Sequence, residues 1–226
     1  MKIGNYRLVD LTHVIEPEVG ARPVHIERVP APEAVPDGAL STTTWYIMHR
    51  VDMHLNHVGT HIETPYHVRP EGRDVSTVPL ESLCGEAVVL DLTAVPGGGV
   101  VSLDDVTAAA ERAGGIRRGD IVLGRFDYDG GPGANRNFAA EAIAYLVDAG
   151  MKMMGVDLPG IELPRSDPRA IDQHNHHQLL DNDICLIERV ANLAALRKPR
   201  VFVFAAPVPI QGLDSFPVRM VALEEA

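Results

Sequence analysis

Cysteine, aromatic residues and long apolar runs are all scarce in this chain. The two cysteines, Cys84 and Cys185, are too few for a disulfide framework, which favours a reduced, cytoplasmic setting. No stretch approaches the roughly 20 apolar residues of a membrane span. The opening, MKIGNYRLVDLTH, lacks the apolar run and the cleavage site of a signal peptide. We therefore expect no membrane partner.

Basic residues are also in deficit, with 20 lysines and arginines against 31 aspartates and glutamates, and the formal net charge is −11. Nucleic acids and anionic membrane surfaces bind basic patches, so we expect neither of them as a partner. A small anionic substrate stays compatible with this charge, because a bound metal ion reverses the local sign.

The alternation of short apolar runs and helical segments indicates an α/β fold. Ser102 and Asp105 form an S-x-x-D start signal for a helix over residues 103–113. Asn137 is the expected N-cap of a second helix over residues 138–149. The predicted strands are residues 87–92, 120–126, 152–157, 183–188, 200–206 and 218–223.

Neither an internal repeat nor a shift in composition divides the chain, so we expect one domain over residues 1–226. Residues 16–41 carry five prolines and are expected to form an extended arm or a long loop.

The segment HVGTHIETPYH brings together His57, His61, Glu63 and His67. A solvated, histidine-rich turn is one explanation of this cluster, and a metal cage is the other. Imidazole and carboxylate together suit Zn, Mn or Fe. Because the spacings permit the side chains to converge, we interpret the segment as part of a metal site.

The local backbone explains how convergence would arise. Pro65 pushes Thr64 toward an extended conformation, and Gly59 permits a tight bend before it. His61 and Glu63 lie two residues apart on extended chain, so they face the same side. The histidine before the bend can fold back toward them, and the last histidine follows if the pleat continues past the proline.

A second cluster, DQHNHHQLLDNDICLIE, offers His174, His176 and His177, and an apolar run then leads into Glu188. A carboxylate at the end of such a run is expected to be at least partly buried, and a buried carboxylate needs a partner. That partner is either a metal ion or a nearby arginine such as Arg189.

The first segment resembles the H-x-G-T-H-x-D-x-P-x-H signature of the cyclase family, which includes bacterial kynurenine formamidases and isatin hydrolases. The similarity continues through LVDLTHVI, CGEAVVLDL, GDIVLGRF, GVDLPGIE, HHQLLDNDICLIERVANL and GLDSFPVRMVAL, and so covers nearly the whole chain. It implies a single α/β domain around a mixed, barrel-like β-sheet with outer helices. It also implies a homodimer or higher homo-oligomer, a contact that the arm at 16–41 could serve.

The resemblance also implies roles for individual residues. It implies one or two divalent ions, Zn or Mn, and the matching metal ligands are His57, His61, Glu63, His176 and Glu188. His67 matches the catalytic histidine, and His176 is chosen over its neighbours for its spacing to Glu188. Glu63 departs from the family signature, which usually has Asp there. The segment RFDYDGG also departs from the R-T-G-W-like segment of formamidases, so the substrate is not carried over.

The implied activity is the hydrolysis of a small amide or lactam, of the N-formylkynurenine or isatin type. A divalent metal lowers the pKa of bound water from 15.7 to about 7 and so provides a hydroxide that attacks the carbonyl. His67 would move the proton to the departing amine. Two alternatives stay open: a metal-dependent lyase or cyclase that stabilises an enolate, and a non-catalytic metal-binding protein.

Evidence on the substrate is thin in the sequence, where aromatic residues make up 5%. Arg219 is a candidate for binding a substrate carboxylate, with a structural ion pair as the alternative. Gln211 and Asp214 lie in the loop PIQGLDSFP and are assigned no role. The candidates for an aryl pocket, each of which ordinary packing also explains, are Trp45, Tyr46, Tyr66, Phe126, Tyr128 and Phe216.

Overall fold

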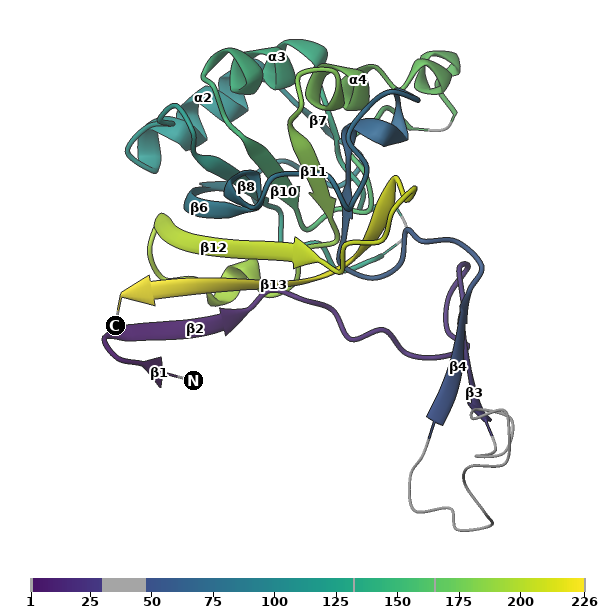
Figure 1. Cartoon of the computed structure of the whole chain (residues 1–226). Coiled ribbons are helices and arrows are strands. Elements are labelled where there is room, and N and C mark those ends of the chain that lie inside the picture. The colour runs from purple at the N-terminus through teal and green to yellow at the C-terminus, as the bar shows by residue number, and fades with distance from the viewer. Residues whose placement is uncertain (1, 30–47, 132, 165, 226) are drawn as a thin grey trace.

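A closed ring of seven strands forms the centre of the fold, in a computed structural model that describes residues 2–29, 48–131, 133–164 and 166–225 (Figure 1). In ring order the strands are β13 (Ser215–Glu225), β12 (Arg200–Pro207), β6 (Cys84–Asp91), β8 (Ile121–Arg125), β10 (Met153–Val156), β11 (Cys185–Glu188) and β5 (His61–Glu63). β5 pairs with β13 and closes the ring. β6, β8, β10 and β11 run parallel to one another, and the other neighbours in the ring are antiparallel. The predicted mixed, barrel-like sheet is therefore confirmed.

All six strands predicted from apolar runs are present, and their burial explains the runs. β10 is buried along its whole length, and β8 is buried at four of its five positions. Ile121 and Leu123 of β8 pack inside the barrel, whereas Val122 points outward into a second apolar cluster beneath the helices. A strand that is covered on both faces reads as a continuous apolar run rather than as an alternation.

Helices cover one wall of the barrel (Figure 1). They are α2 (Leu103–Arg112), α3 (Ala140–Asp148) and α4 (His174–Leu180). α2 begins as predicted: the Ser102 hydroxyl accepts a hydrogen bond from the Asp105 amide at 3.2 Å, and the Asp105 carboxylate accepts one from the Ser102 amide at 2.9 Å. This reciprocal capping satisfies two amides that the first turn leaves unpaired.

The predicted start of the second helix is wrong. Asn137 is buried within the short strand β9 (Asn137–Phe138), which pairs in parallel with β7 (Val100–Val101). α3 begins only at Ala140, after an extended Ala139 that makes no side-chain cap. The pairing with a strand more than thirty residues away overrides the local preference of asparagine for a helix start.

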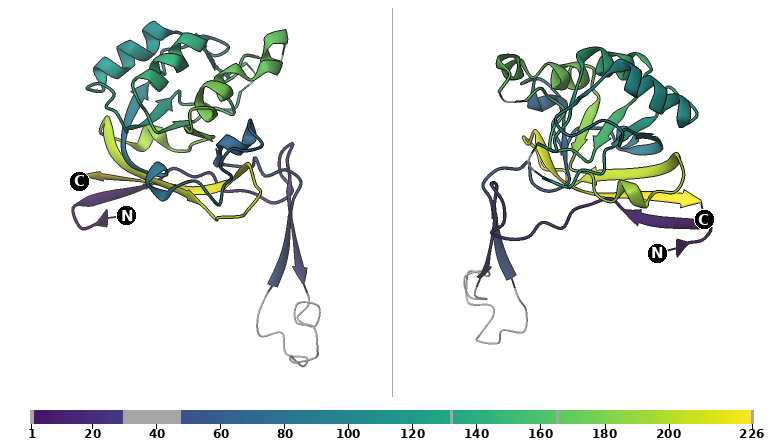
Figure 2. Two further views of the ribbon diagram at one scale, coloured as in Figure 1. Left: turned by 45° about the horizontal axis from the view of Figure 1, so that its top comes forward. Right: turned by 180° about the vertical axis from the view of Figure 1, so that it is seen from behind.

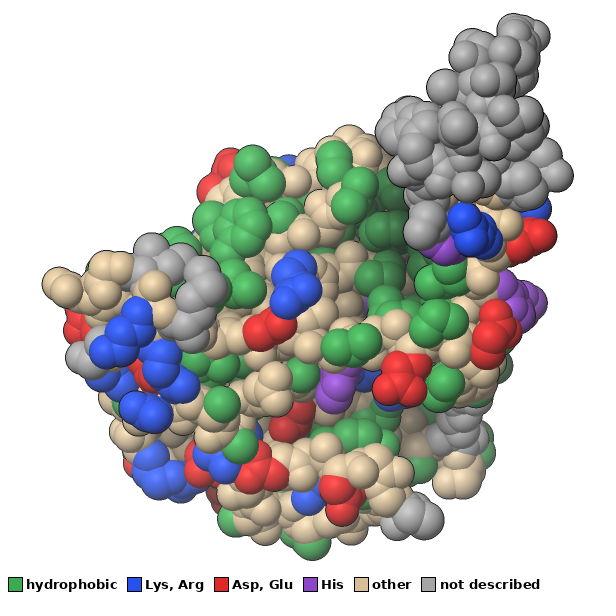
Figure 3. All heavy atoms as spheres, turned by 90° about the horizontal axis from the view of Figure 1, so that it is seen from below, with side chains coloured by type: hydrophobic (Ala, Val, Ile, Leu, Met, Phe, Trp, Pro, Cys, Tyr) green, Lys and Arg blue, Asp and Glu red, His purple; other side chains and the backbone are tan. Residues whose placement is uncertain are grey.

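The other wall, formed by β12, β13 and β2 (Tyr6–Asp10), has none of the described helices over it (Figure 1). β2 pairs with β13 outside the ring, and β1 (Lys2–Ile3) pairs with β2. Phe202 and Phe204 of β12 are exposed. Seen from below, this side of the molecule carries hydrophobic side chains between polar ones (Figure 3).

A hairpin extends away from the barrel (Figures 1 and 2). Its strands are β3 (Val24–Val29) and β4 (Met48–Met53), which pair antiparallel. In the described part of the predicted arm, residues 16–23 form turns and bends and Val24–Val29 is the strand β3, while residues 30–41 lie outside the described residues. Its role in a contact between subunits stays a prediction.

Among the described residues, no helix is long and apolar enough to cross a membrane. Short 3₁₀ turns complete the chain and are η1 (Pro65–His67), η2 (Leu80–Ser82), η3 (Pro168–Asp172) and η4 (Leu193–Ala195).

Candidate metal centre

The closing strand β5 positions the first pair of candidate ligands. His61 and Glu63 are both buried and face the same side, as two-residue spacing on a strand requires. In the register with β11, His61 lies directly across from Glu188. His61 Nε2 is 3.7 Å from Glu63 Oε1 and 3.6 Å from Glu188 Oε2. The end of β11, at Glu188, and the start of β5, at His61, therefore lie side by side.

His57 joins this group through the bend at Gly59. Gly59 has a φ of 60°, and a Cβ there would come within 2.8 Å of Ile15, so only glycine suits the position. The bend turns the chain back, and His57 Nε2 lies 3.3 Å from Glu63 Oε1.

His67 reaches the site by a route that differs from the prediction. Thr64 is extended, with φ −112° and ψ 166°, as the residue before a proline should be. The pleat then ends, because Pro65–His67 forms the 3₁₀ turn η1. This turn places the ring of His67 4.9 Å from that of His57 and 6.0 Å from that of His176, measured between ring centroids.

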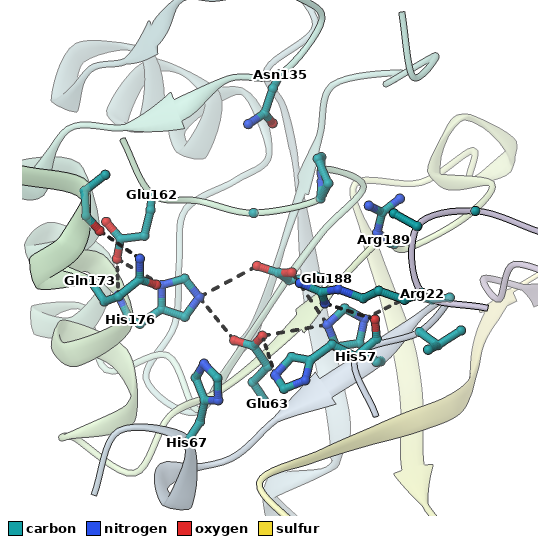
Figure 4. A pocket seen from close by; sticks show the side chains of 18 of the residues that line it. Arg22, His57, Glu63, His67, Asn135, Glu162, Gln173, His176, Glu188 and Arg189 are labelled. Atoms are coloured by element: carbon teal, nitrogen blue, oxygen red, sulfur yellow. Dashed lines mark hydrogen bonds and ion pairs between the residues drawn. The ribbon is translucent and has the colours of Figure 1, made fainter. Parts of the chain in front are cut away.

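Of the three histidines in α4, His176 is the one that faces the carboxylates of the site. His176 is buried, with Nε2 3.1 Å from Glu63 Oε2 and 3.7 Å from Glu188 Oε1. His177 instead contacts Asp181, which directly follows the helix, with Nδ1 3.0 Å from the carboxylate, and His174 is exposed. The structure thus brings together all six candidates predicted from the sequence (Figure 4).

Acceptors behind the rings orient three of these histidines. The Nδ1 atoms of His57, His61 and His176 each lie 2.9 Å from an oxygen, belonging to Asn56, Gly59 and Glu162 respectively. Each Nδ1 therefore donates its hydrogen to that oxygen, and each Nε2 faces the carboxylates of the site. An acceptor behind the ring is the usual arrangement for metal-binding histidines.

Unsatisfied polar atoms test whether a cation fits this site. Within the described residues, Nε2 of His57, Nε2 of His61 and Oε2 of Glu63 are buried without a hydrogen-bond partner. Buried polar atoms are normally paired, and buried carboxylates need a compensating charge. His61, Glu63 and Glu188 each offer one ligand atom, and these three atoms all lie within 4.8 Å of one another. Three imidazoles and two carboxylates suit a divalent ion such as Zn or Mn.

The electrostatics of the site also favour a cation. Burial raises the pKa of Glu188, and repulsion from Glu63 raises it further. Burial lowers the pKa of His57 to about 4, which keeps its ring neutral. Burial alone would also lower the pKa of His176, but the carboxylates of Glu162, Glu188 and Glu63 around its ring raise that pKa to about 12. Without a metal ion, a proton on His176 thus provides the positive charge that the carboxylates require.

Asp214 is a functional candidate that sequence reasoning leaves without a role. Its Oδ2 lies 2.7 Å from His67 Nδ1, and its Oδ1 accepts a hydrogen bond of 2.7 Å from Asn56. The hydrogen bond to Asp214 raises the pKa of His67, while the same bond lowers the pKa of Asp214 to about 2. No short-range pattern in the sequence marks it, because it reaches His67 through the pairing of Ser215, the first residue of β13, with Glu63.

Two alternatives from the sequence are decided by these contacts. The ion-pair partners of Glu188 among the described residues are His61 and His176, and no contact with Arg189 is formed. Arg219 pairs with Asp10 at 2.5 Å on the surface, so it has a structural partner and does not line the site.

The candidate ligands open into a pocket of about 1030 Å³. Its other walls include Arg22 from the base of the hairpin, Glu162 and Gln173 from the region before α4, and Arg189 after β11. None of the described residues in its lining is Phe, Tyr or Trp. The aromatic candidates named from the sequence therefore do not line this pocket where they are described: Phe126 packs in the core, and Trp45 and Tyr46 lie outside the described residues.

Known proteins resemble this chain over most of its length. The family model described as putative cyclase matches residues 9–163. A kynurenine formamidase of Salinibacter ruber is 33% identical over 170 residues, which span 73% of this chain and 74% of the relative. Among solved structures, isatin hydrolase A from Labrenzia aggregata bound to benzyl benzoate has a TM-score of 0.82 at 22% identity, covering 99% of this chain and 95% of its own, and this likeness concerns the fold alone. A potential metal-dependent hydrolase with cyclase activity has a TM-score of 0.75 at 26% identity, covering 98% of this chain and 99% of its own.

Proposed function

Because this chain belongs to the cyclase family, we propose that it is a metal-dependent hydrolase that cleaves the C–N bond of a small amide or lactam. The observation that carries the proposal is the convergence of three imidazole Nε2 atoms on two buried carboxylates. The similarity to a kynurenine formamidase makes N-formyl amides the first substrate class to test, and isatin-like lactams the second.

We assign the ion to the side chains that lack other partners. His57, His61 and Glu63 would hold it on one side of the site, and His176 and Glu188 would complete the ligand set on the other. Glu63 faces both sides, with Oε1 toward His57 and Oε2 toward His176, so it would be shared if two ions bind. A divalent Zn or Mn ion held there supplies Lewis acidity, which activates water and polarises a carbonyl.

His67 is positioned to move the proton. Its Nδ1 hydrogen points to Asp214, which leaves Nε2 as the atom that accepts a proton from the attacking water. As the C–O bond forms and the C–N bond breaks, the same Nε2 returns this proton to the departing nitrogen. Asp214 holds the ring in this tautomer and stabilises its charged form, while Asn56 fixes the carboxylate.

Metal analysis and product analysis test the proposal together. We expect protein purified without chelator to contain about one or two equivalents of Zn or Mn, and to release a carboxylic acid and an amine from members of an amide and lactam panel. Chelation should abolish turnover, and adding the metal back should restore it. Uptake of oxygen from labelled water separates hydrolysis from an elimination or cyclisation. Protein that takes up neither metal under any loading condition, or that binds metal and turns over no panel member, contradicts the proposal.

The outer contact of His176 gives a prediction with a matched control. Replacing Glu162 with alanine removes the acceptor at His176 Nδ1, so we expect the affinity for metal to fall by about 10–100-fold. Asp181→Ala removes the acceptor of His177 on the exposed side of the same helix and should leave the affinity within about twofold. Competition titration against a chromophoric chelator measures both. Equal effects of the two substitutions would show that the orientation of His176 does not matter.

A further inference from the structure

Two arginines line the pocket on the side of His57. Arg22 Nη1 donates a hydrogen bond of 3.2 Å to the His57 carbonyl, and Arg189 directly follows Glu188. Figure 4 shows both on this side of the carboxylates, with Glu162 and Gln173 on the opposite side beside His176. The pocket therefore has a positively charged end and a mainly acidic and amide end, with the candidate metal ligands between them.

β11 ends at Glu188, and the backbone turns at Arg189, which lines the pocket. Its φ of 55° is left-handed, a conformation that non-glycine residues seldom adopt and that clusters at functional sites. The turn is held on both sides: the Arg189 amide donates to the Leu158 carbonyl at 2.9 Å, and the Arg189 carbonyl accepts from the Thr60 hydroxyl at 2.6 Å. A residue that continued the strand would not line the pocket with the same side chain.

Neither guanidinium forms an ion pair with a carboxylate among the described residues. Some other described arginines do, with Arg125 paired to Asp127 and Arg169 paired to Asp167 at 2.7 Å, whereas the exposed Arg117 and Arg118 do not. The carboxylates of the lining do not pair with Arg189, because Glu63, Glu188 and Glu162 face histidines and Asp167 pairs with Arg169. Within the described residues, the two guanidinium groups of the lining therefore have no carboxylate partner.

The chemistry of these groups points to the ligand. A guanidinium presents paired donors that match the two oxygens of a carboxylate. The described lining has no Phe, Tyr or Trp to offer a large apolar ring. We propose that Arg22 and Arg189 form a carboxylate-binding subsite, and that the substrate is an amide or lactam bearing an acid group apart from the bond that is cleaved. This inference rests on the proposed function and names its substrate class.

Matched pairs of acids and esters test the subsite. N-formylglycine, N-formyl-β-alanine and N-formyl-γ-aminobutyrate place the acid at increasing distance from the formamide, and their methyl esters remove its charge. In the wild-type protein we expect kcat/KM for the best acid to exceed that for its ester by about 10–100-fold, as for a hydrogen bond to a charged group. Arg189→Gln and Arg22→Gln should lower kcat/KM for the acid about 10–100-fold more than kcat/KM for its ester, so that the preference is lost, and Arg189→Lys should restore part of it.

Arg219→Gln is the control, since it removes the same charge from an exposed arginine outside the pocket. It should leave both rates unchanged, and metal analysis of every variant excludes damage to Glu188. Equal rates for acids and esters in the wild type, or an Arg189→Gln variant that keeps the preference, overturns the subsite and leaves the hydrolase proposal standing. If no compound is turned over, the hydrolase proposal fails for this panel, and calorimetric binding of the acids and esters still decides the subsite. Acid-selective binding that is lost in Arg189→Gln supports it, and equal binding overturns it.

Discussion

Replacing His67 with alanine is expected to lower kcat by about 10²–10⁴-fold while the protein keeps its metal. The imidazole lies beside the candidate ligands, but its Nδ1 is engaged by Asp214, and its place in the mechanism is to accept and return one proton. Its loss removes proton transfer without removing a ligand. Steady-state rates on the best amide, together with metal content by plasma mass spectrometry, measure the two properties separately.

The Asp214→Asn variant tests the contact between Asp214 and His67. The amide preserves the shape of the side chain but removes the charge that stabilises a protonated ring, so kcat should fall by less than in His67→Ala, with the metal again retained. Loss of metal from His67→Ala would reassign His67 as a ligand. An unchanged rate in that variant would exclude it from proton transfer.

The second large effect is expected at Glu63. Glu63→Gln keeps the size of the side chain and removes its charge from a buried site, so we expect the affinity for metal to fall on the order of 10³-fold, and turnover to fall with it. Glu63 contacts His57, His61 and His176 at once, which makes it the residue whose loss affects every part of the ligand set. Metal titration and amide hydrolysis measure the effect.

Two further variants bracket this result. Glu63→Asp restores the residue usual in the family signature, and we expect it to keep metal and measurable turnover. Glu141→Gln changes an exposed glutamate of α3 in the same way and should change neither property. Full retention of metal and activity by Glu63→Gln would remove Glu63 from the ligand set.

The sequence predicts those features that depend on short-range patterns. The apolar runs give the strands, and the spacing of His61 and Glu63 on one strand gives their common direction. The burial of Glu188 follows from the apolar residues before it. In each case the residues that decide the structure lie within a few positions of one another.

Features that depend on pairing across the chain are not predictable in this way. Asp214 meets His67 across 147 positions, and Asn137 joins a strand instead of capping a helix. α4 has seven residues, too few for a clear periodic pattern. Glu162 and Asn56 accept from histidines, and Asn56 also donates to Asp214, through contacts whose geometry the fold determines.

The closure of the barrel by β13 also has a consequence for how the protein folds. β13 pairs with β5, β12 and β2, and residues 64 and 214 at the closing seam are 150 positions apart. Such distant pairings give a high contact order, and chains of this kind fold in milliseconds to seconds rather than microseconds. The candidate ligands on β5 and β11 meet through the direct pairing of those two strands, whereas the candidate proton-transfer pair, His67 and Asp214, meets only at the seam between β5 and β13. The two parts of the candidate site therefore depend on different strand pairings, and a cation that binds the finished ring stabilises the native state by mass action.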